Sequence, residues 1–159
     1  MRALSIRQPW AWLILHAGKD IENRNWRPRN PGLRFRGTCL IHAGIAVQPI
    51  SDELRAWVKQ TAGVDLPRSD ELPRGGIVGQ VDVVDVVRAS SSPWFEGPCG
   101  LVLKNSKPLP FRAYKGRLGF FVPQPPELPP GCTVSAQTND DEETELARNL
   151  LIEAGKMAA

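Results

Sequence analysis

LSIRQPWAWLILHAGKDIENRNW, residues 4–26, predicts a strand, a short helix and a second strand in direct succession, and this unit decides the fold. Its opening residues alternate between apolar and polar, which is typical of a strand. Pro9 is favoured at the first position of a helix, and Gly18 is favoured where a left-handed residue ends one. We therefore expect a helix of about two turns between two strands.

The second strand carries charged residues close together in the segment GKDIENR, residues 18–24. Because side chains alternate across a strand, Glu22 and Arg24 share a face with Trp26, while Lys19 stands at the corner between helix and strand. The charged cluster either binds a ligand or forms an internal salt-bridge network that stabilises the corner. As cleft-lining charges, these residues are expected to tolerate substitution with little loss of stability.

The rest of the chain predicts further short strands and one clear amphipathic helix. The helix is ISDELRAWVKQTAG (50–63), with Ser51 as its N-cap, Trp57 as an anchor on its apolar face and Gly63 as its stop. The further strands are GTCLIHAG (37–44), GGIVGQVDVVDVV (75–87), CGLVLKN (99–105) and GRLGFFV (116–122). The fold class is thus α+β, a small mixed β-barrel of about five or six strands with two or three peripheral helices.

The character of the chain changes at PQPPELPPG, where closely spaced prolines favour an extended linker. We expect a barrel domain over residues 1–122 and a Pro-rich linker with an acidic tail over residues 123–159. The tail either forms a terminal helix, capped at Asn139 or Asp140, or remains a frayed, solvated segment.

Several classes of protein are disfavoured by composition. Three cysteines without CxxC spacing and two histidines support neither a disulfide framework nor a zinc site. No Gly-rich nucleotide loop, nucleophile elbow or HExxH motif occurs, so we expect no metal and no cofactor. AWLILHAG is far shorter than the roughly 18 apolar residues of a membrane span. We expect a soluble, cytoplasmic monomer that does not enter a membrane.

The net charge of +3 hides an asymmetry along the chain. Residues 124–159 hold seven acidic and two basic residues, so residues 1–123 carry a net charge of +8. A body that basic attracts polyanions, and nucleic acid is the commonest such partner. The alternative is a basic surface that is merely solvated.

The order of motifs resembles the ASCH (activating signal cointegrator homology) domain over about residues 3–122. The segments that carry the resemblance are LSIRQPWAWLILHAGKDIENRNW, LIHAG, GIVGQVDVVDVV, GPCGLVLKN and YKGRLGFF. The family is similar to PUA domains in fold, a small β-barrel associated with RNA and other nucleic acids. The resemblance implies a basic cleft beside the first helix that holds a nucleotide or a strand.

The residues of GKDIENR suit that role, because Lys19 and Arg24 can engage phosphate and Glu22 can accept hydrogen bonds from a base amine. Trp26 lies in the basic run NRNWRPR, where an aromatic ring suits stacking on a base. The candidate nucleic-acid-binding residues are Lys19, Arg24, Trp26, Arg27, Arg29, Arg34, Arg36, Trp12 and His42.

Two function classes follow from the resemblance. The first is a binding module for RNA or single-stranded DNA. The second is a metal-independent hydrolase, either an N4-acylcytidine amidohydrolase or a ribonuclease, with Lys19 and Glu22 as catalytic residues. In the amidohydrolase branch a threonine stands three residues after the lysine, and this chain has Glu22 there. A carboxylate cannot replace a nucleophilic hydroxyl directly, so Glu22 would instead activate water while Lys19 polarises the amide.

Overall fold

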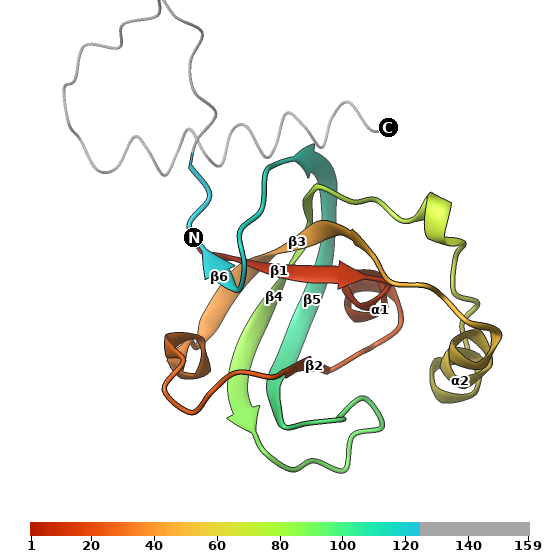
Figure 1. The fold of residues 1–159 in the computed structure, drawn as a ribbon, viewed down its shortest axis with the longest axis horizontal. Coiled ribbons are helices and arrows are strands. Elements are labelled where there is room, and N and C mark those ends of the chain that lie inside the picture. The colour runs from red at the N-terminus through yellow and green to blue at the C-terminus, as the bar shows by residue number, and fades with distance from the viewer. Residues whose placement is uncertain (125–159) are drawn as a thin grey trace, which may run out of the picture. The chain divides into compact units, whose positions relative to one another are not determined.

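The computed structural model describes residues 1–124, apart from the side chain of Val47, and shows six strands in one curled sheet (Figure 1). In chain order, with η for a 3₁₀-helix, the elements are β1 (Ala3–Gln8), α1 (Trp10–His16), β2 (Ile21–Arg24), η1 (Pro31–Arg34), β3 (Gly37–Val47), α2 (Asp52–Ala62), η2 (Ser69–Glu71), β4 (Gly76–Val87), β5 (Cys99–Ala113) and β6 (Phe120–Phe121). The predicted α+β class and small barrel are confirmed.

The sheet is mixed, and its strand order is β2-β5-β4-β3-β1-β6. β1 runs parallel to β3, whereas the pairings β1–β6, β2–β5, β3–β4 and β4–β5 are antiparallel. The curl brings β2 back towards β1: the Arg24 guanidinium donates a hydrogen bond to the Ser5 carbonyl at 2.8 Å, although three strands separate β2 from β1 in the sheet. One side chain therefore bridges the open side of the barrel.

The first helix forms as its sequence predicts. Pro9 is its N-cap, one position earlier than expected, and the Gln8 side chain accepts a hydrogen bond from the Trp12 amide at 3.0 Å. This bond satisfies one of the amides that a helix start leaves without a partner. Gly18 has φ +68°, the left-handed conformation that glycine adopts without strain, and turns the chain into β2.

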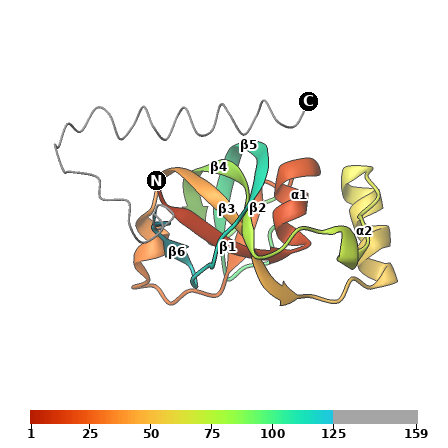
Figure 2. The ribbon, with the colours of Figure 1, turned by 90° about the horizontal axis from the view of Figure 1, so that it is seen from above.

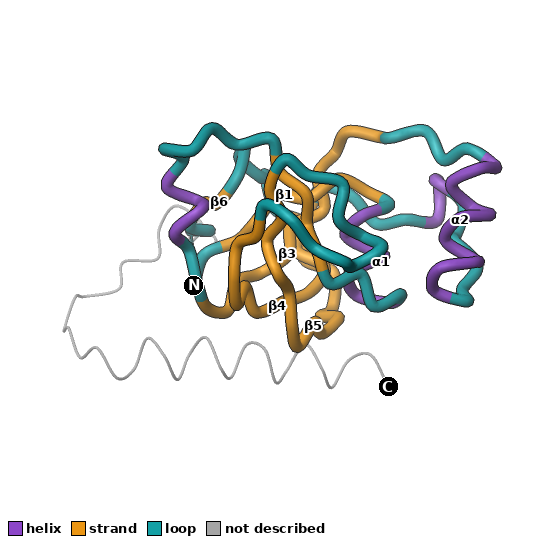
Figure 3. Tube along the Cα trace, turned by 90° about the horizontal axis from the view of Figure 1, so that it is seen from below, coloured by secondary structure: helices purple, strands orange, loops and turns teal. Residues whose placement is uncertain are grey.

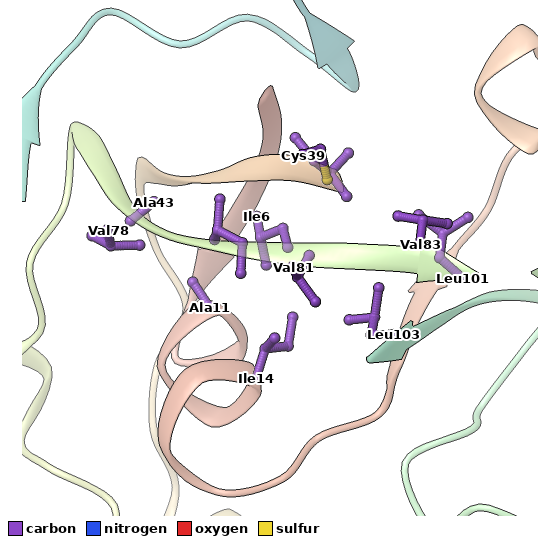
Figure 4. Close-up of a cluster of buried hydrophobic side chains, with 12 residues drawn as sticks. Ile6, Ala11, Ile14, Cys39, Ala43, Val78, Val81, Val83, Leu101 and Leu103 are labelled. Atoms are coloured by element: carbon purple, nitrogen blue, oxygen red, sulfur yellow. The ribbon is translucent and has the colours of Figure 1, made fainter. Parts of the chain in front are cut away.

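The main core is packed between the curled sheet and α1 (Figure 4). Ala11 and Ile14 enter it from the helix. The strands supply Leu4, Ile6, Cys39, Ile41, Ala43, Val78, Val81, Val83, Leu101 and Leu103. Burying each large apolar side chain contributes about 1.5–3 kcal/mol, so this layer fixes the sheet on which the remaining elements are placed.

A second cluster joins α1, α2 and the loop of residues 88–98. Its buried members are Leu13, Ile21, Val58, Leu66 and Trp94. α2 is capped by the Ser51 hydroxyl, which accepts from the Leu54 amide, and ends at the left-handed Gly63, as predicted. The cluster holds α2 beside α1 at one end of the sheet (Figure 2).

Several segments differ from their predicted form. β3 runs past its predicted end at Gly44 to Val47. β5 continues past Asn105 to Ala113, and its pairing with β4 shifts register between the Pro108 and Arg112 pairs. β6 is reduced to two residues. The basic run after β2, for which the sequence predicted no helix, contains η1.

The predicted linker and tail lie outside the described residues from position 125 onward, as do the alternatives for the tail and Cys132. Residues Met1–Pro123 form one compact unit.

Cys39 and Cys99 are buried and free, and burial is the main reason that the pKa of Cys39 rises to about 12. Within residues 1–124 no helix combines the length and apolar character that crossing a membrane requires.

Candidate functional site

A pocket of about 260 Å³ opens where α1, α2, the start of β2 and the loop of residues 88–98 meet. Its lining residues are Trp10, Lys19, Glu22, Asn23, Gln48, Trp57, Trp94 and Glu96, and we call it the tryptophan pocket. It combines three indole rings with two carboxylates, two amides and one ammonium group. That mixture of flat apolar faces and a few polar groups is typical of a site for a small, planar, polar ligand.

The three indole rings come from three separate elements. Trp57 on α2 meets Trp94 of the loop edge to face, with ring centroids 5.0 Å apart and planes at 87°. Trp10 on α1 donates from Nε1 to the side-chain oxygen of Gln48 at 3.1 Å. These contacts fix the aromatic walls without a ligand.

Lys19 and Glu22 are both pocket-lining and members of an ion network. Their residues are only 4% and 7% exposed. Lys19 Nζ donates to the Ile21 carbonyl and lies 3.3 Å from Glu22 Oε2, while Arg24 lies 3.1 Å from Glu22 Oε1. The network that the sequence left as an alternative is therefore present, and it places two of its side chains at the pocket.

Burial lowers the pKa of the Lys19 ammonium from its usual value of 10.5, because charged amines are poorly solvated in the interior. The Coulombic attraction of Glu22 and its hydrogen bond oppose this shift but do not cancel it. Lys19 Nζ also lies 5.8 Å from the Trp10 ring centroid. With a lowered pKa, this amine releases its proton at a lower pH than a surface lysine does.

Asn23 positions the loop that carries Trp94. Its amide nitrogen donates to the Trp94 carbonyl at 2.8 Å, and its side-chain oxygen accepts from the amides of Glu96 and Gly97 at 2.9 and 3.3 Å. A single side chain of β2 thereby satisfies three backbone groups of a segment that has no strand partner. The pocket wall is thus tied directly to the sheet.

The structure places the remaining predicted residues away from this pocket. Trp26 packs on Gly32 and lies 5.9 Å from Phe120. Trp12 is half-buried on α1 beside His16, at a ring distance of 5.1 Å. The predicted arginines of the segment after β2 are exposed, and they are Arg27, Arg29, Arg34 and Arg36.

His42 is a buried residue of β3 that ties down the segment before β6. Its Nε2 faces the Tyr114 carbonyl at 2.8 Å, and its Nδ1 lies 3.3 Å from the Ser5 hydroxyl. A side chain on Gly116 would overlap the imidazole ring, so the segment is packed directly on it. This environment is that of a structural histidine.

Sequence reasoning missed six pocket residues, Trp10, Asn23, Gln48, Trp57, Trp94 and Glu96. Trp57 was interpreted as an anchor of its helix, and it does pack in the second cluster while it also lines the pocket. The only available signal was the number of tryptophans, five in a small domain. Among residues 1–124 no three His, Cys, Asp or Glu side chains gather in a way that could hold a metal ion.

Comparison with known proteins identifies the family. The model of the ASCH domain family matches residues 4–125. The chain is similar to human Activating signal cointegrator 1, with 33% identity over 85 residues, which is 52% of this chain and 14% of the human protein. The chain therefore corresponds to a small part of that relative. Since the family model matches most of the sequence, this chain belongs to the ASCH domain family.

Proposed function

We propose that this chain binds single-stranded nucleic acid and takes one unpaired base into the tryptophan pocket. The observation that carries the proposal is the set of three indole rings around a pocket of about 260 Å³. Membership of the ASCH family supports it, because that family is generally associated with RNA binding.

The chemistry of the lining suits a nucleobase. Stacking of a base on an aromatic side chain contributes about 1–3 kcal/mol and is tolerant of sequence. The perpendicular Trp57 and Trp94 offer aromatic surface in two directions. The Gln48 amide and the Glu96 carboxylate add groups that hydrogen-bond to base edges.

The net charge of residues 1–123 suits a polyanion. Residues 1–123 carry a net charge of +8, and the arginines after β2 are exposed. Exposed cations attract phosphates over a Debye length of about 10 Å at 0.1 M salt. Arginine contacts to the backbone then hold the strand while the pocket holds the base.

The test is fluorescence polarisation with a labelled single-stranded RNA of eight nucleotides. Trp57→Ala removes one wall of the pocket, and we expect about 5- to 150-fold weaker binding, the equivalent of 1–3 kcal/mol. Trp57→Phe keeps an aromatic face and is expected to bind nearly normally. Trp12→Ala is the matched control, because Trp12 is also half-buried on a helix but does not line the pocket.

The same titrations measure the salt dependence of binding. Each phosphate contact on a single strand is expected to add about −0.7 to the slope of log K against log salt. Association that is undetectable at low salt, or that Trp57→Ala and Trp12→Ala weaken equally while both variants remain folded, would contradict the proposal.

A second candidate is an amidohydrolase, and the observation in its favour is the lowered pKa of Lys19 beside Glu22 at the pocket. None of the eight lining residues is Ser, Thr or Cys, so water would be the nucleophile. Water would add to the acyl carbon of N4-acetylcytidine while Glu22 takes its proton, and Glu22 would pass that proton to N4 as the C–N bond breaks, which gives cytidine and acetate.

Chromatography after incubation of the protein with N4-acetylcytidine tests this candidate directly. Incubation with the labelled single-stranded RNA, followed by gel analysis of its length, tests for ribonuclease activity. Release of cytidine that is lost in Lys19→Met would establish the hydrolase. Intact substrates together with Trp57-dependent binding would assign the pocket to binding alone.

A further inference from the structure

η1 and β6 lie beside each other at the end of the sheet away from α2 (Figure 3). A second pocket, of about 320 Å³, is lined by residues of these two elements. Its lining residues are Arg2, Trp26, Asn30, Pro31, Gly32, Leu118, Gly119 and Phe120, and we call it the Trp26 pocket. None of these residues is acidic. The tryptophan pocket, by contrast, is lined by two glutamates.

The aromatic part of the Trp26 pocket is held in place by close packing. A Cβ at Gly32 would lie 2.6 Å from the Trp26 ring, so the indole rests directly on the backbone of η1. Phe120 of β6 lies 5.9 Å from the same indole. Leu118 is 97% exposed at the pocket, so an apolar side chain already faces the solvent there.

The arginines around this pocket make it positively charged. Arg2 is part of the lining, and the Arg24 guanidinium lies 5.1 Å from the Trp26 ring centroid. Arg27 and Arg29 follow Trp26 directly in the chain and are exposed. The lining contains an aromatic ring and an arginine and has no carboxylate. Such a lining suits a ligand that has a planar ring at one end and a negative charge at the other. A nucleotide has that form.

Arg24 connects the two pockets. The same guanidinium pairs with Glu22, which lines the tryptophan pocket, and lies over Trp26, which lines the second one. Three residues lie between Glu22 and Trp26, and the four chain steps that join them span at most about 14 Å. A stacked single strand advances about 3.4 Å per nucleotide, so at most about four nucleotides cover that distance.

On the basis of the proposed function, we propose that the Trp26 pocket is a second nucleotide subsite on the same bound strand. A base contacts Trp26 and Phe120, and its phosphate meets Arg2. The bound strand runs past Arg24 and reaches the tryptophan pocket with another base at most about four nucleotides away.

The experiment follows the indole N–H resonances of the full chain by NMR, with the Trp26 signal assigned through Trp26→Phe. A dinucleotide is too short to reach both pockets, and a hexanucleotide is long enough. We expect the hexanucleotide to shift the Trp26 and Trp57 signals together at one saturation point, with an affinity at least tenfold above that of the dinucleotide.

Arg2→Glu tests the phosphate contact, and Arg7→Glu is its matched control. Both arginines are exposed near or in β1 and the two changes alter net charge equally, but Arg7 lines neither pocket. Arg2→Glu is expected to reduce the tenfold advantage of the hexanucleotide to less than threefold, whereas Arg7→Glu preserves it.

The outcomes separate this inference from the function on which it rests. A Trp57 signal that shifts while the Trp26 signal stays in place, or equal effects of Arg2→Glu and Arg7→Glu, would overturn the second subsite and leave the first intact. Tryptophan signals that all remain unshifted by either ligand would remove the proposed function and the subsite together.

Discussion

At the scale of single residues, the charged cluster of β2 is buried more deeply than its sequence suggested. Substitutions at Lys19 and Glu22 were expected to leave the fold nearly intact, because exposed or cleft-lining charges contribute little to stability. Both residues line the tryptophan pocket, but both are less than a tenth exposed, so their removal from water adds a cost that the sequence did not show. A charge removed from water is tolerated only while its partner remains.

Glu22 stands between two cations, and this position predicts which substitution damages the fold. Glu22→Gln leaves Lys19 and Arg24 facing each other without a carboxylate, and we expect it to lower the free energy of unfolding by about 3–5 kcal/mol. Lys19→Met leaves the Glu22–Arg24 pair in place and keeps the length of the side chain. It is expected to change stability by less than about 1 kcal/mol.

Urea unfolding of the two variants measures this difference. Losses below about 1 kcal/mol in both Glu22→Gln and Lys19→Met would show that the three side chains act as independent surface charges. The same result would restore the expectation drawn from the sequence.

At the scale of elements, the sequence correctly predicted the features that depend only on neighbouring residues, such as helix caps and stops. The stop at Gly18 and the cap at Ser51 are properties of a few neighbouring residues, and the structure has both where the sequence places them. The end of β5 was missed because a proline normally ends a strand, whereas here the pairing with β4 shifts its register beside Pro108. That shift depends on another strand and has no local signature.

The tryptophan pocket could not be predicted for the same reason. Its aromatic walls come from α1, α2 and a loop, and they meet only because the second apolar cluster holds those elements together. Alternation along β2 correctly placed Glu22 and Arg24 on one face. It could not show that Trp94, more than 60 positions further along the chain, lies opposite them.

Asn23 is the residue through which β2 controls the loop of Trp94, and it supports a prediction about that element. Asn23→Ala removes the acceptor of the Glu96 and Gly97 amides, so we expect faster hydrogen exchange at both amides and weaker binding of single-stranded RNA. Asn23→Asp retains a side-chain oxygen at that position and is expected to keep both amides protected. Unchanged exchange in Asn23→Ala would mean that packing of Trp94, rather than hydrogen bonding, holds the loop.

At the scale of the whole molecule, the distribution of charge separates two parts of the chain. Residues 1–123 carry +8 and contain both pockets, whereas the full chain carries only +3. An acidic segment covalently joined to a basic domain lowers the attraction that the domain exerts on phosphate. This effect is electrostatic, so salt screens it.

A shortened chain of residues 1–123 is expected to unfold in one cooperative thermal transition, since those residues form a compact unit with its own core. We also expect it to bind single-stranded RNA more tightly than the full chain at 50 mM salt, with the difference disappearing near 500 mM.

The control is a full-length variant in which Asp140, Asp141, Glu142 and Glu143 are changed to Asn or Gln. If charge is the cause, this variant gains affinity as the shortened chain does, because it removes four negative charges without removing any length. A gain seen only on shortening would assign the effect to the bulk of the segment, and a broad, non-cooperative transition would show that residues 124–159 belong to the folded unit.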